Sequence, residues 1–401
     1  MPETYRQPLV NRRFRLFALG FGISSLGDGM SALAVAWLAI EISSPTNRGL
    51  VVGAAVAAYT LPGAIGIFLR RLLGQLDSRR LLLLNSALRA ACLGTIALLA
   101  YLGRLQILSY VALLAGSALL ASWGTAARYS LVAETLPERM RLSANALLGT
   151  LLNLGVIVGP AAAGVLTAVT GAAAVLSLDA ASWLIYAGCV LLAHARPVVA
   201  TEQIPGPIAS GQAGGALQMI VRDRSLLGLL ILTLTFYFFY GPVEVALPIF
   251  VKQNLHQSAA VLGAFWTCFG IGAVTGSLAF PIIRRGPLFT MALLIIIGWG
   301  VTLGVIPFVS VPFGIASFTV GGLIWAPYPT LVTTFLQQQT SGRSLTALSA
   351  AWTSATMLAT PLGSAVGGPL VTATGPGRTL VISALATLAI VPVAAVARRS
   401  A

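Results

Sequence analysis

The chain alternates between long runs of apolar and small residues and short polar segments. Twelve of these runs approach or exceed the ~20 residues that a helix needs to cross a bilayer. We place them at residues 14–41, 49–69, 81–102, 107–133, 144–166, 174–194, 225–251, 259–283, 287–308, 313–336, 344–372 and 379–397. The runs lack the alternating polarity of membrane β-strands. The pattern therefore predicts an all-α polytopic membrane protein with twelve transmembrane helices.

One polar stretch is much longer than the others and divides the chain. Residues 196–224 are rich in Pro, Gly, Ser and Gln, and they predict a cytoplasmic linker between spans six and seven. We expect one six-helix half over residues 1–195 and a second over residues 225–401. The halves also repeat, since SLVAETL at Ser130–Leu136 is matched by TLVTTFL at Thr330–Leu336. Related halves around a central site are a transporter architecture.

Composition supports a membrane location and argues against nucleic-acid binding. Of the 401 residues, 57% are hydrophobic and 8% are charged, whereas a soluble domain has about 25% charged residues. The net charge of +14 comes from basic residues scattered between apolar runs, not from a basic stripe or tail. The lipid bilayer, and not nucleic acid, is therefore the expected surrounding partner.

The distribution of positive charge predicts the orientation of the chain. Of the 24 Lys and Arg residues, 18 fall in segments on the side of the termini and 4 in the opposite loops. Because positive charge marks the cytoplasmic side, we expect both termini in the cytoplasm. The excess of Arg, Ala and Gly suggests a bacterial source, and hence the inner membrane.

The sequence contains no motif for ATP hydrolysis, catalysis or metal binding. It has no GxxxxGK[ST] loop and no evident set of nucleophile, histidine and acid, and its three cysteines and two histidines do not cluster as metal ligands. We therefore expect no enzyme activity, no cofactor and no metal. A transporter of this kind uses an ion gradient or runs downhill. Because each chain supplies both halves, we expect a monomer.

Small residues in span five carry a resemblance to a known family. In GVIVGPAAAG, the spacing of Gly155, Gly159 and Gly164 permits close helix packing, and Pro160 bends the helix. The stretch matches the GxxxGPxxGG antiporter motif of the major facilitator superfamily except at Ala163. With the predicted spans and the long linker, the chain resembles this superfamily over most of its length. The resemblance implies two pseudo-symmetric six-helix halves, and it implies that the motif governs alternation between conformations.

Further stretches resemble the bacterial efflux branch of the superfamily, with its macrolide, tetracycline and enterobactin exporters. They are NRRFRLFALGFGISSLGDG at span one, LVAETLPERMRLSANAL before span five and LDAASWLIYA in span six. The resemblance favours proton-coupled export of amphipathic small molecules, such as drugs or a secreted metabolite, by alternating access. The alternatives are a proton-coupled uptake symporter of the same fold and a non-transporting membrane receptor or scaffold.

The loop after span two departs from the superfamily pattern Gly-x-x-x-Asp-Arg-x-Gly-Arg-Arg. In RRLLGQLDSRRL, Asp77, Arg79 and Arg80 match the end of that pattern, but Arg70 replaces the Gly and Gly74 replaces the Asp. The charge relay that the resemblance implies at the inner gate is then incomplete. Alternatively, these arginines only set the topology.

Asp28 lies well inside span one, where a charge is costly and a functional role is the first hypothesis. Ser24, Ser25 and Ser31 share its face at helical spacing, and their hydroxyls can hydrogen-bond the neutral or the charged acid without an arginine. Burial disfavours the charged form of a carboxylate. We therefore expect Asp28 to load and release the coupling proton.

Two further acids lie within predicted spans. Glu244 is in span seven, the equivalent of span one in the other half, and we expect it to share proton coupling or bind a cationic substrate. For Asp28 and Glu244 alike, the alternative is a structural ion pair with Arg89 or Arg128. Asp179 starts span six near the outer face, and there we expect an ordinary position close to water.

Aromatic residues on two spans predict a substrate site between the halves. The resemblance places span seven, with Tyr237 and Tyr240, and span ten, with Trp325 and Tyr328, around the central cavity. An aromatic wall suits a bulky, partly apolar ligand; the alternative is a packing or interfacial cluster. Arg128, near the inner end of span four, is a candidate to bind an anionic substrate, to pair with an acid or to reach the cytoplasm.

Overall fold

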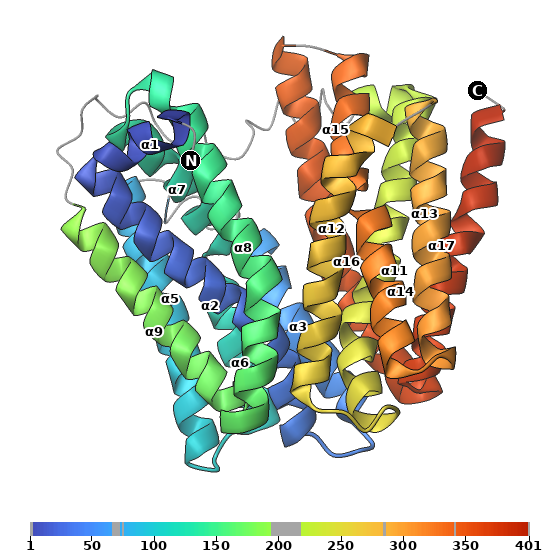
Figure 1. Cartoon of the computed structure of the whole chain (residues 1–401), viewed down its shortest axis with the longest axis horizontal. Helices are drawn as coiled ribbons and strands as arrows, with labels where there is room; N and C mark the ends of the chain where they lie inside the picture. Colours follow the sequence, from blue (N-terminus) through green and yellow to red (C-terminus); the bar gives the residue numbers. More distant parts are fainter. Residues whose placement is uncertain are drawn as a thin grey trace. The chain divides into compact units, whose positions relative to one another are not determined.

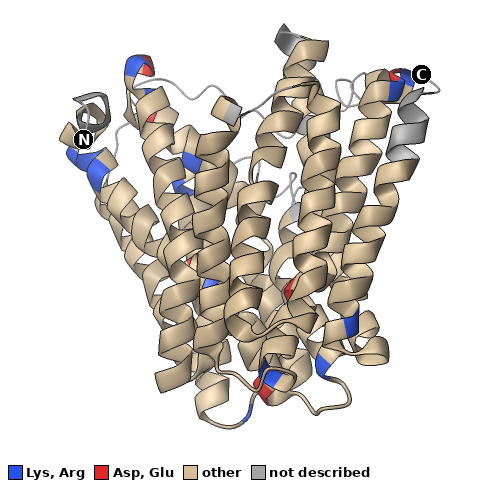
Figure 2. Cartoon of the chain, turned by 45° about the vertical axis from the view of Figure 1, so that its right-hand side comes forward, with Lys and Arg blue, Asp and Glu red and all other residues tan. Residues whose placement is uncertain are grey.

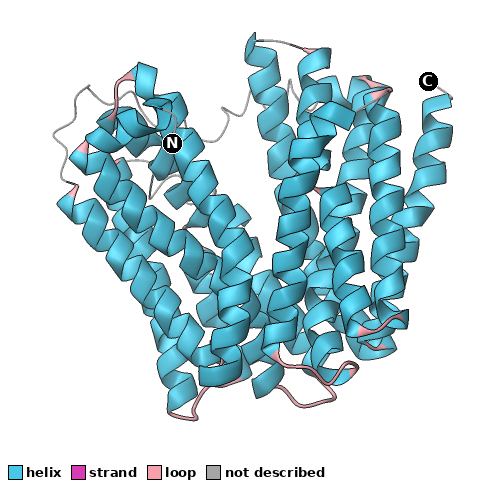
Figure 3. Ribbon diagram, in the orientation of Figure 1, coloured by secondary structure: helices cyan, strands magenta, loops and turns pink. Residues whose placement is uncertain are grey.

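The computed structural model describes residues 3–65, 73, 76–193, 218–283, 286–340 and 342–399. Every regular element in these ranges is helical (Figures 1 and 3), which confirms the predicted fold class. The earlier helices are α1 (Glu3–Val10), α2 (Arg12–Ile42), α3 (Arg48–Ile65), α5 (Ser78–Tyr101), α6 (Ile107–Ala118), α7 (Ala121–Thr135), α8 (Glu138–Thr170) and α9 (Ala172–Leu192). The later helices are α11 (Arg224–Gln253), α12 (Ala259–Ile283), α13 (Leu288–Val305), η2 (Ile306–Phe308), α14 (Val311–Trp325), α15 (Pro327–Gln339), α16 (Gly342–Thr374) and α17 (Pro376–Arg399).

The chain is a multi-pass membrane protein. Within the described residues, nine segments are long and apolar enough to cross a membrane, and they coincide with nine predicted spans. The other three predicted spans correspond to α3, α16 and α17. The apolar part of α17, Pro376–Pro392, is shorter than the other nine segments. The full count of twelve therefore stays a prediction.

Contacts between residues group the chain into two compact units. The first unit comprises Met1–Ile42 and Ala58–Pro207, and the second comprises Ser43–Ala57 and Ile208–Ala401. The first half of α3 thus belongs with the second unit, where Gly53 lies against the backbone of Gly368 in α16. Of the predicted linker, residues 196–217 lie outside the described ranges.

The same packing order occurs inside each unit. In the first unit, α2 packs against α8 and α9, and α5 packs against α9. In the second unit, α11 packs against α16 and α17, and α13 packs against α17. These helices are the equivalent spans of the two predicted halves, so the packing repeats as the sequence does.

Helix α2 forms the centre of the first unit. In the most apolar 18-residue stretch of α2, 78% of the residues are buried, compared with 33% in α8. The reason is that α2 carries apolar and small residues on all of its faces. Charged residues lie mostly at or near helix ends, and only a few lie along the spans (Figure 2). Those few mark the positions where a charge needs an explanation.

Two predicted spans are each built from two successive helices. Helix α6 ends at Ala118 and α7 begins at Ala121, while α14 ends at Trp325 and α15 begins at Pro327. Proline lacks a backbone N–H and clashes with the preceding turn, which explains the second break. A helix that ends inside a span leaves carbonyl groups without helical partners.

Candidate functional site

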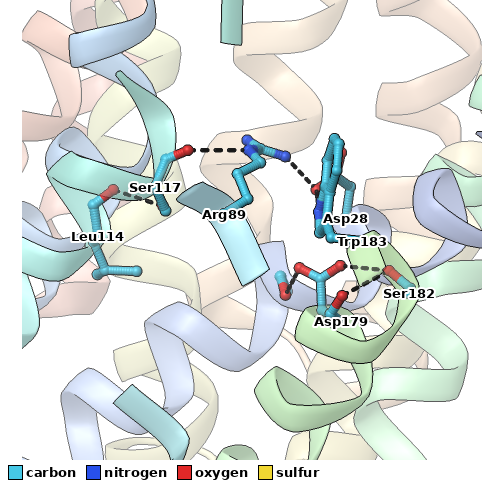
Figure 4. A network of polar contacts seen from close by, with 8 residues as sticks. Asp28, Arg89, Leu114, Ser117, Asp179, Ser182 and Trp183 are labelled. Atoms are coloured by element: carbon cyan, nitrogen blue, oxygen red, sulfur yellow. Dashed lines mark hydrogen bonds and ion pairs between the residues drawn. The ribbon is translucent and has the colours of Figure 1, made fainter. Parts of the chain in front are cut away.

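Asp28 of α2 and Arg89 of α5 form an ion pair inside the first unit (Figure 4). The Oδ1 atom of Asp28 lies 2.5 Å from Nη1 of Arg89. Trp183 of α9 donates its Nε1–H to the same oxygen at 3.3 Å. The side chain of Asp28 is 33% exposed and that of Arg89 is 10% exposed. The carboxylate is therefore held by side chains from two other helices.

Arg89 is oriented by the break in span four. Its Nε donates to the carbonyl oxygen of Ser117 at 3.2 Å, and Ser117 lies in the last turn of α6, where carbonyls lack helical partners. The guanidinium carbon also lies 4.7 Å from the ring centroid of Trp183 and 5.7 Å from that of Tyr59. The end of α6 thus supplies the acceptor that fixes the cation beside Asp28.

The ion pair is the alternative that the sequence allowed for Asp28, and it corrects the expectation about the serines. Ser31 donates its hydroxyl to Asp179 and not to Asp28. The buried Oγ of Ser25 has no hydrogen-bond partner among the described residues. The reason is that α5 brings Arg89 to Asp28, whereas Ser31, one turn further along α2, meets α9. A coupling role for Asp28 stays a prediction.

The position close to water that the sequence predicted for Asp179 is wrong. Asp179 is fully buried. Ser31 Oγ lies 2.5 Å from its Oδ2, and Ser182 Oγ lies 3.1 Å from its Oδ1. Helix α2 comes this close because a Cβ at Gly27 would collide with both Asp179 and Ser182. The signal in the sequence was the spacing of Asp179, Ser182 and Trp183, which places them on one helix face.

Glu244 of α11 has a different environment from Asp28. Ser364 of α16 donates its hydroxyl to Oε2 of Glu244 at 3.2 Å. Glu244 is half-buried and forms no ion pair within the described part of the chain. Tyr240 precedes it by one helical turn, on the same face of α11. The ion pair considered for Glu244 is therefore not observed there.

The four aromatic residues predicted to line a substrate site lie together in the second unit. The ring centroid of Tyr237 is 6.2 Å from those of both Trp325 and Tyr328. Tyr240 stacks on Trp325 at 6.0 Å with an angle of 30° between the rings. Tyr328 is fully buried and its hydroxyl lies 2.9 Å from Oγ1 of Thr233, whereas the other three residues are partly exposed. Three rings can thus meet a ligand, and Tyr328 supports them.

The cluster extends inwards to further aromatic residues. Trp299 is fully buried, with its ring centroid 5.7 Å from that of Tyr240. Phe269 lies 5.8 Å from Trp299 and 6.0 Å from Trp325. The indole N–H groups of both tryptophans are buried and lack an acceptor among the described residues.

Arg128 of α7 contacts aromatic rings instead of an acid. Its guanidinium carbon lies 4.6 Å from the ring centroid of Phe21 and 4.9 Å from that of Tyr129. Among the residues that the structure describes, it forms no ion pair. The pairing of Arg128 with an acid, one of its predicted alternatives, is therefore not observed there. Anion binding by Arg128 stays a prediction.

The small residues of α8 mark its crossing with α2. A Cβ on Gly159 would lie 2.7 Å from Cα of Gly29, and one on Gly155 would collide with the backbone of α2. Pro160 and Gly164 are buried in the same stretch, and α8 is continuous through the proline. The glycines therefore allow the two backbones to touch. Their role in conformational alternation stays a prediction.

The residues after span two begin α5. Asp77 caps this helix, since its Oδ1 accepts the backbone N–H of Arg80 at 2.8 Å. The same two side chains form an exposed ion pair at 3.8 Å, and Arg79 donates to a carbonyl near the end of α9 at 3.2 Å. Two departures from the family pattern, Arg70 and Gly74, lie outside the described residues. A gating role for this segment stays a prediction.

The chain is similar in sequence to a known family of proteins. The family model of the Major Facilitator Superfamily matches residues 17–360. The uncharacterized MFS-type transporter y4rN of Sinorhizobium fredii is 26% identical over 386 residues, which cover 92% of this chain and 93% of that protein. The multidrug efflux pump Tap of Mycobacterium tuberculosis is 28% identical over 394 residues, with 90% and 88% covered.

Solved structures share the fold at low sequence identity. The nucleoside transporter NupG has a TM-score of 0.74 and 13% identity, with 96% of this chain and 98% of that chain covered. A bacterial homolog of the human lysosomal transporter Spinster has a TM-score of 0.71 and 12% identity, with 98% and 96% covered. At these identities the similarity concerns the fold alone.

Proposed function

This chain belongs to the Major Facilitator Superfamily, and we propose that it exports amphipathic small molecules in exchange for protons. The family and the relatives named above are transporters, so the chain is a transporter and not an enzyme. Export is favoured by the similarity to the multidrug efflux pump Tap over most of both chains. The ionisable groups within the spans support coupling to protons.

One observation carries the proposal: each unit holds carboxyl groups inside its spans, Asp28 and Asp179 in the first unit and Glu244 in the second. Asp28 lies in α2, and Glu244 lies in α11, which has the equivalent packing partners. Acids inside membrane spans are costly and recur in proton relays. Glu244 contacts a serine hydroxyl, which can serve a neutral or a charged carboxyl group. A proton taken up from one side and released to the other drives the export of substrate.

The aromatic cluster of the second unit supports a bulky, partly apolar substrate. Tyr237, Tyr240 and Trp325 present ring faces, which bind flat apolar groups and cations. Glu244, one turn from Tyr240, favours a cationic substrate when it is ionised.

The proposal includes a location and an orientation: a monomer in a bacterial inner membrane, with both termini in the cytoplasm. The predicted linker ends with Arg222 and Arg224, at which trypsin can cut, whereas the bond after Arg196 leads to Pro197 and resists trypsin. Trypsin added to inside-out membrane vesicles should therefore cleave the chain into its halves. If trypsin instead cleaves the linker in right-side-out vesicles and not in inside-out vesicles, the predicted orientation is wrong and the termini lie outside.

The decisive experiment measures transport of ethidium, a permanent aromatic cation, by the purified full chain in liposomes. The membrane potential is clamped with valinomycin and equal potassium concentrations. An antiporter accumulates ethidium when the lumen is acidic, because protons leave as the dye enters. Accumulation is expected to stop with a protonophore and to be missing in liposomes without protein.

The same experiment separates the alternatives. A substrate:proton symporter accumulates the dye only when the outside is acidic, because proton and substrate then enter together. Dye binding without flux in either gradient would identify a receptor or scaffold. Either result would reject proton-coupled export for this probe.

A further inference from the structure

We propose that Asp179 holds the exchangeable proton of the first unit, while Asp28 stays ionised in its pair with Arg89. The inference rests on the proposed function and names a proton-carrying residue within it. It follows from the different hydrogen-bond partners of two neighbouring carboxyl groups. Ser31, which contacts Asp179, lies three residues after Asp28, one helical turn along α2.

The partners of Asp28 are suited to a carboxylate that keeps its charge. Arg89 and the indole N–H of Trp183 both approach Oδ1, and both groups are donors only; the Tyr59 hydroxyl is a third hydrogen-bond partner of Asp28. Such donors stabilise the ionised form, and the guanidinium supplies a full opposite charge at 2.5 Å. Protonation of Asp28 would leave the cation without its counter-charge.

The partners of Asp179 are suited to an acid that changes its charge. Ser31 and Ser182 contact its two carboxyl oxygens through hydroxyl groups, which donate to a carboxylate and accept from a carboxylic acid. Asp179 is fully buried and forms no ion pair within the described residues. A buried charge without a counter-ion is strongly disfavoured. The acid is therefore neutral in this conformation and holds a proton.

The surrounding charges lead to the same assignment. Helices α2, α5 and α8 pack against α9, which carries Asp179. Asp28 from α2 and Arg89 from α5 are the charged groups near Asp179, and they compensate each other, while Glu138, Arg139 and Arg141 of α8 lie in its first turns, away from the crossing. The other titratable side chains around the cluster are Tyr59, Cys92 and Tyr186. The cluster is thus neutral when Asp179 is protonated.

Release of the proton requires a change of this arrangement. The O–H bond of the Asp179 carboxyl group breaks, the proton passes to water on the open side, and the negative charge remains on the carboxylate. Arg89 lies against the ring of Trp183, which is one helical turn from Asp179 on α9, and it is the cation positioned to compensate that charge. Gly27 keeps α2 against Asp179 and so excludes water in the closed arrangement. Separation of α2 from α9 at this point admits water to the acid.

Infrared difference spectroscopy on the purified full chain tests the assignment without any substrate. We expect a protonated-carboxyl band that disappears as the pH is raised and that is lost in Asp179→Asn. Asp28→Asn should also lose it, because the released Arg89 turns to Asp179 and keeps it ionised. The double variant Asp28→Asn/Arg89→Gln should regain the band, because Asp179 is then again without a cation. Glu244→Gln should remove only the part of the carboxyl signal that comes from Glu244 and leave the band of Asp179, so this variant is the control for the assignment of the band.

Two outcomes would overturn the inference. One is a band that survives Asp179→Asn unchanged, and the other is a double variant that lacks the band, which would assign the proton to Asp28. The double variant keeps the test valid even if Asp179→Asn does not fold. In the ethidium assay, gradient-driven transport should be lost in Asp179→Asn; its survival would reject the role of Asp179 and leave the exporter intact. If Asp179 titrates in the infrared experiment but the wild type does not transport ethidium, the result counts against the proposed function and not against the assignment of the proton.

Discussion

The carbonyl oxygen of Ser117 accepts a hydrogen bond from Nε of Arg89 at 3.2 Å. Since Ser117 lies in the last turn of α6, the break in span four and the ion pair with Asp28 form one connected structure. A movement of α6 away from α5 would release one side of the guanidinium. The orientation of Arg89 is thus coupled to the position of the broken span.

This relationship predicts the effect of Arg89→Lys. Lysine keeps the charge but lacks the planar fork that reaches Asp28 and Ser117 at once. We expect a loss of about 1 kcal/mol in the free energy of unfolding, typical of one hydrogen bond, measured by denaturation in detergent. Arg104→Lys, at an exposed position, is the matched control and should leave stability unchanged. Equal stability of both variants would argue against the Ser117 contact.

The crossing of α2 and α8 predicts a difference between two glycine substitutions in one helix. The added Cβ in Gly159→Ala would lie 2.7 Å from Cα of Gly29, so the helices must separate. The Cβ in Gly149→Ala meets nothing within 4 Å, and alanine favours a helix by about 1 kcal/mol over glycine. We expect lower thermal stability and slower ethidium transport for Gly159→Ala only. Similar behaviour of the two variants would contradict the close crossing.

The aromatic cluster predicts graded effects at Trp325. Trp325→Ala removes a ring that stacks on Tyr240, and such a loss is worth about 0.5–1.5 kcal/mol. Ethidium should therefore bind about 2- to 10-fold more weakly by fluorescence titration. Trp325→Phe keeps a ring face and should lose less. Tyr101→Ala, at an exposed position, should bind as the wild type does, and an equal loss there would make the effect nonspecific.

Glu244 predicts a pH dependence of cation binding. An ionised Glu244 attracts a cationic dye and a protonated one does not, so the affinity for ethidium should fall as the pH is lowered. Glu244→Gln keeps a partner for Ser364 but cannot ionise, and it should bind weakly with little dependence on pH. Glu41→Gln, at an exposed position, should keep the dependence of the wild type. An unaltered pH profile in Glu244→Gln would place the titrating group elsewhere.

Much of the architecture could be predicted from the sequence, because the bilayer restricts what a long apolar run can do. With no water to satisfy its backbone, such a run must form a helix. Nine predicted spans coincide with helices long enough to cross a membrane in the described residues. The spacing of Gly155 and Gly159 likewise predicted a close helix crossing, since glycines four residues apart share one face. The grouping of Tyr237 and Tyr240 with Trp325 followed from the family resemblance, which places spans seven and ten around one cavity.

The partners of the buried acids were decided only by the tertiary structure. Asp28 and Arg89 are 61 positions apart, and Ser31 and Asp179 are 148 positions apart. Helical spacing tells which residues share a face, but not which face of another helix meets them. The serines beside Asp28 therefore suggested partners for the wrong acid. Helices α2 and α5 both pack against α9, and this packing brings Arg89 to Asp28 and the serine hydroxyls to Asp179. A charge in a span is stabilised by the groups that the neighbouring helices place within reach.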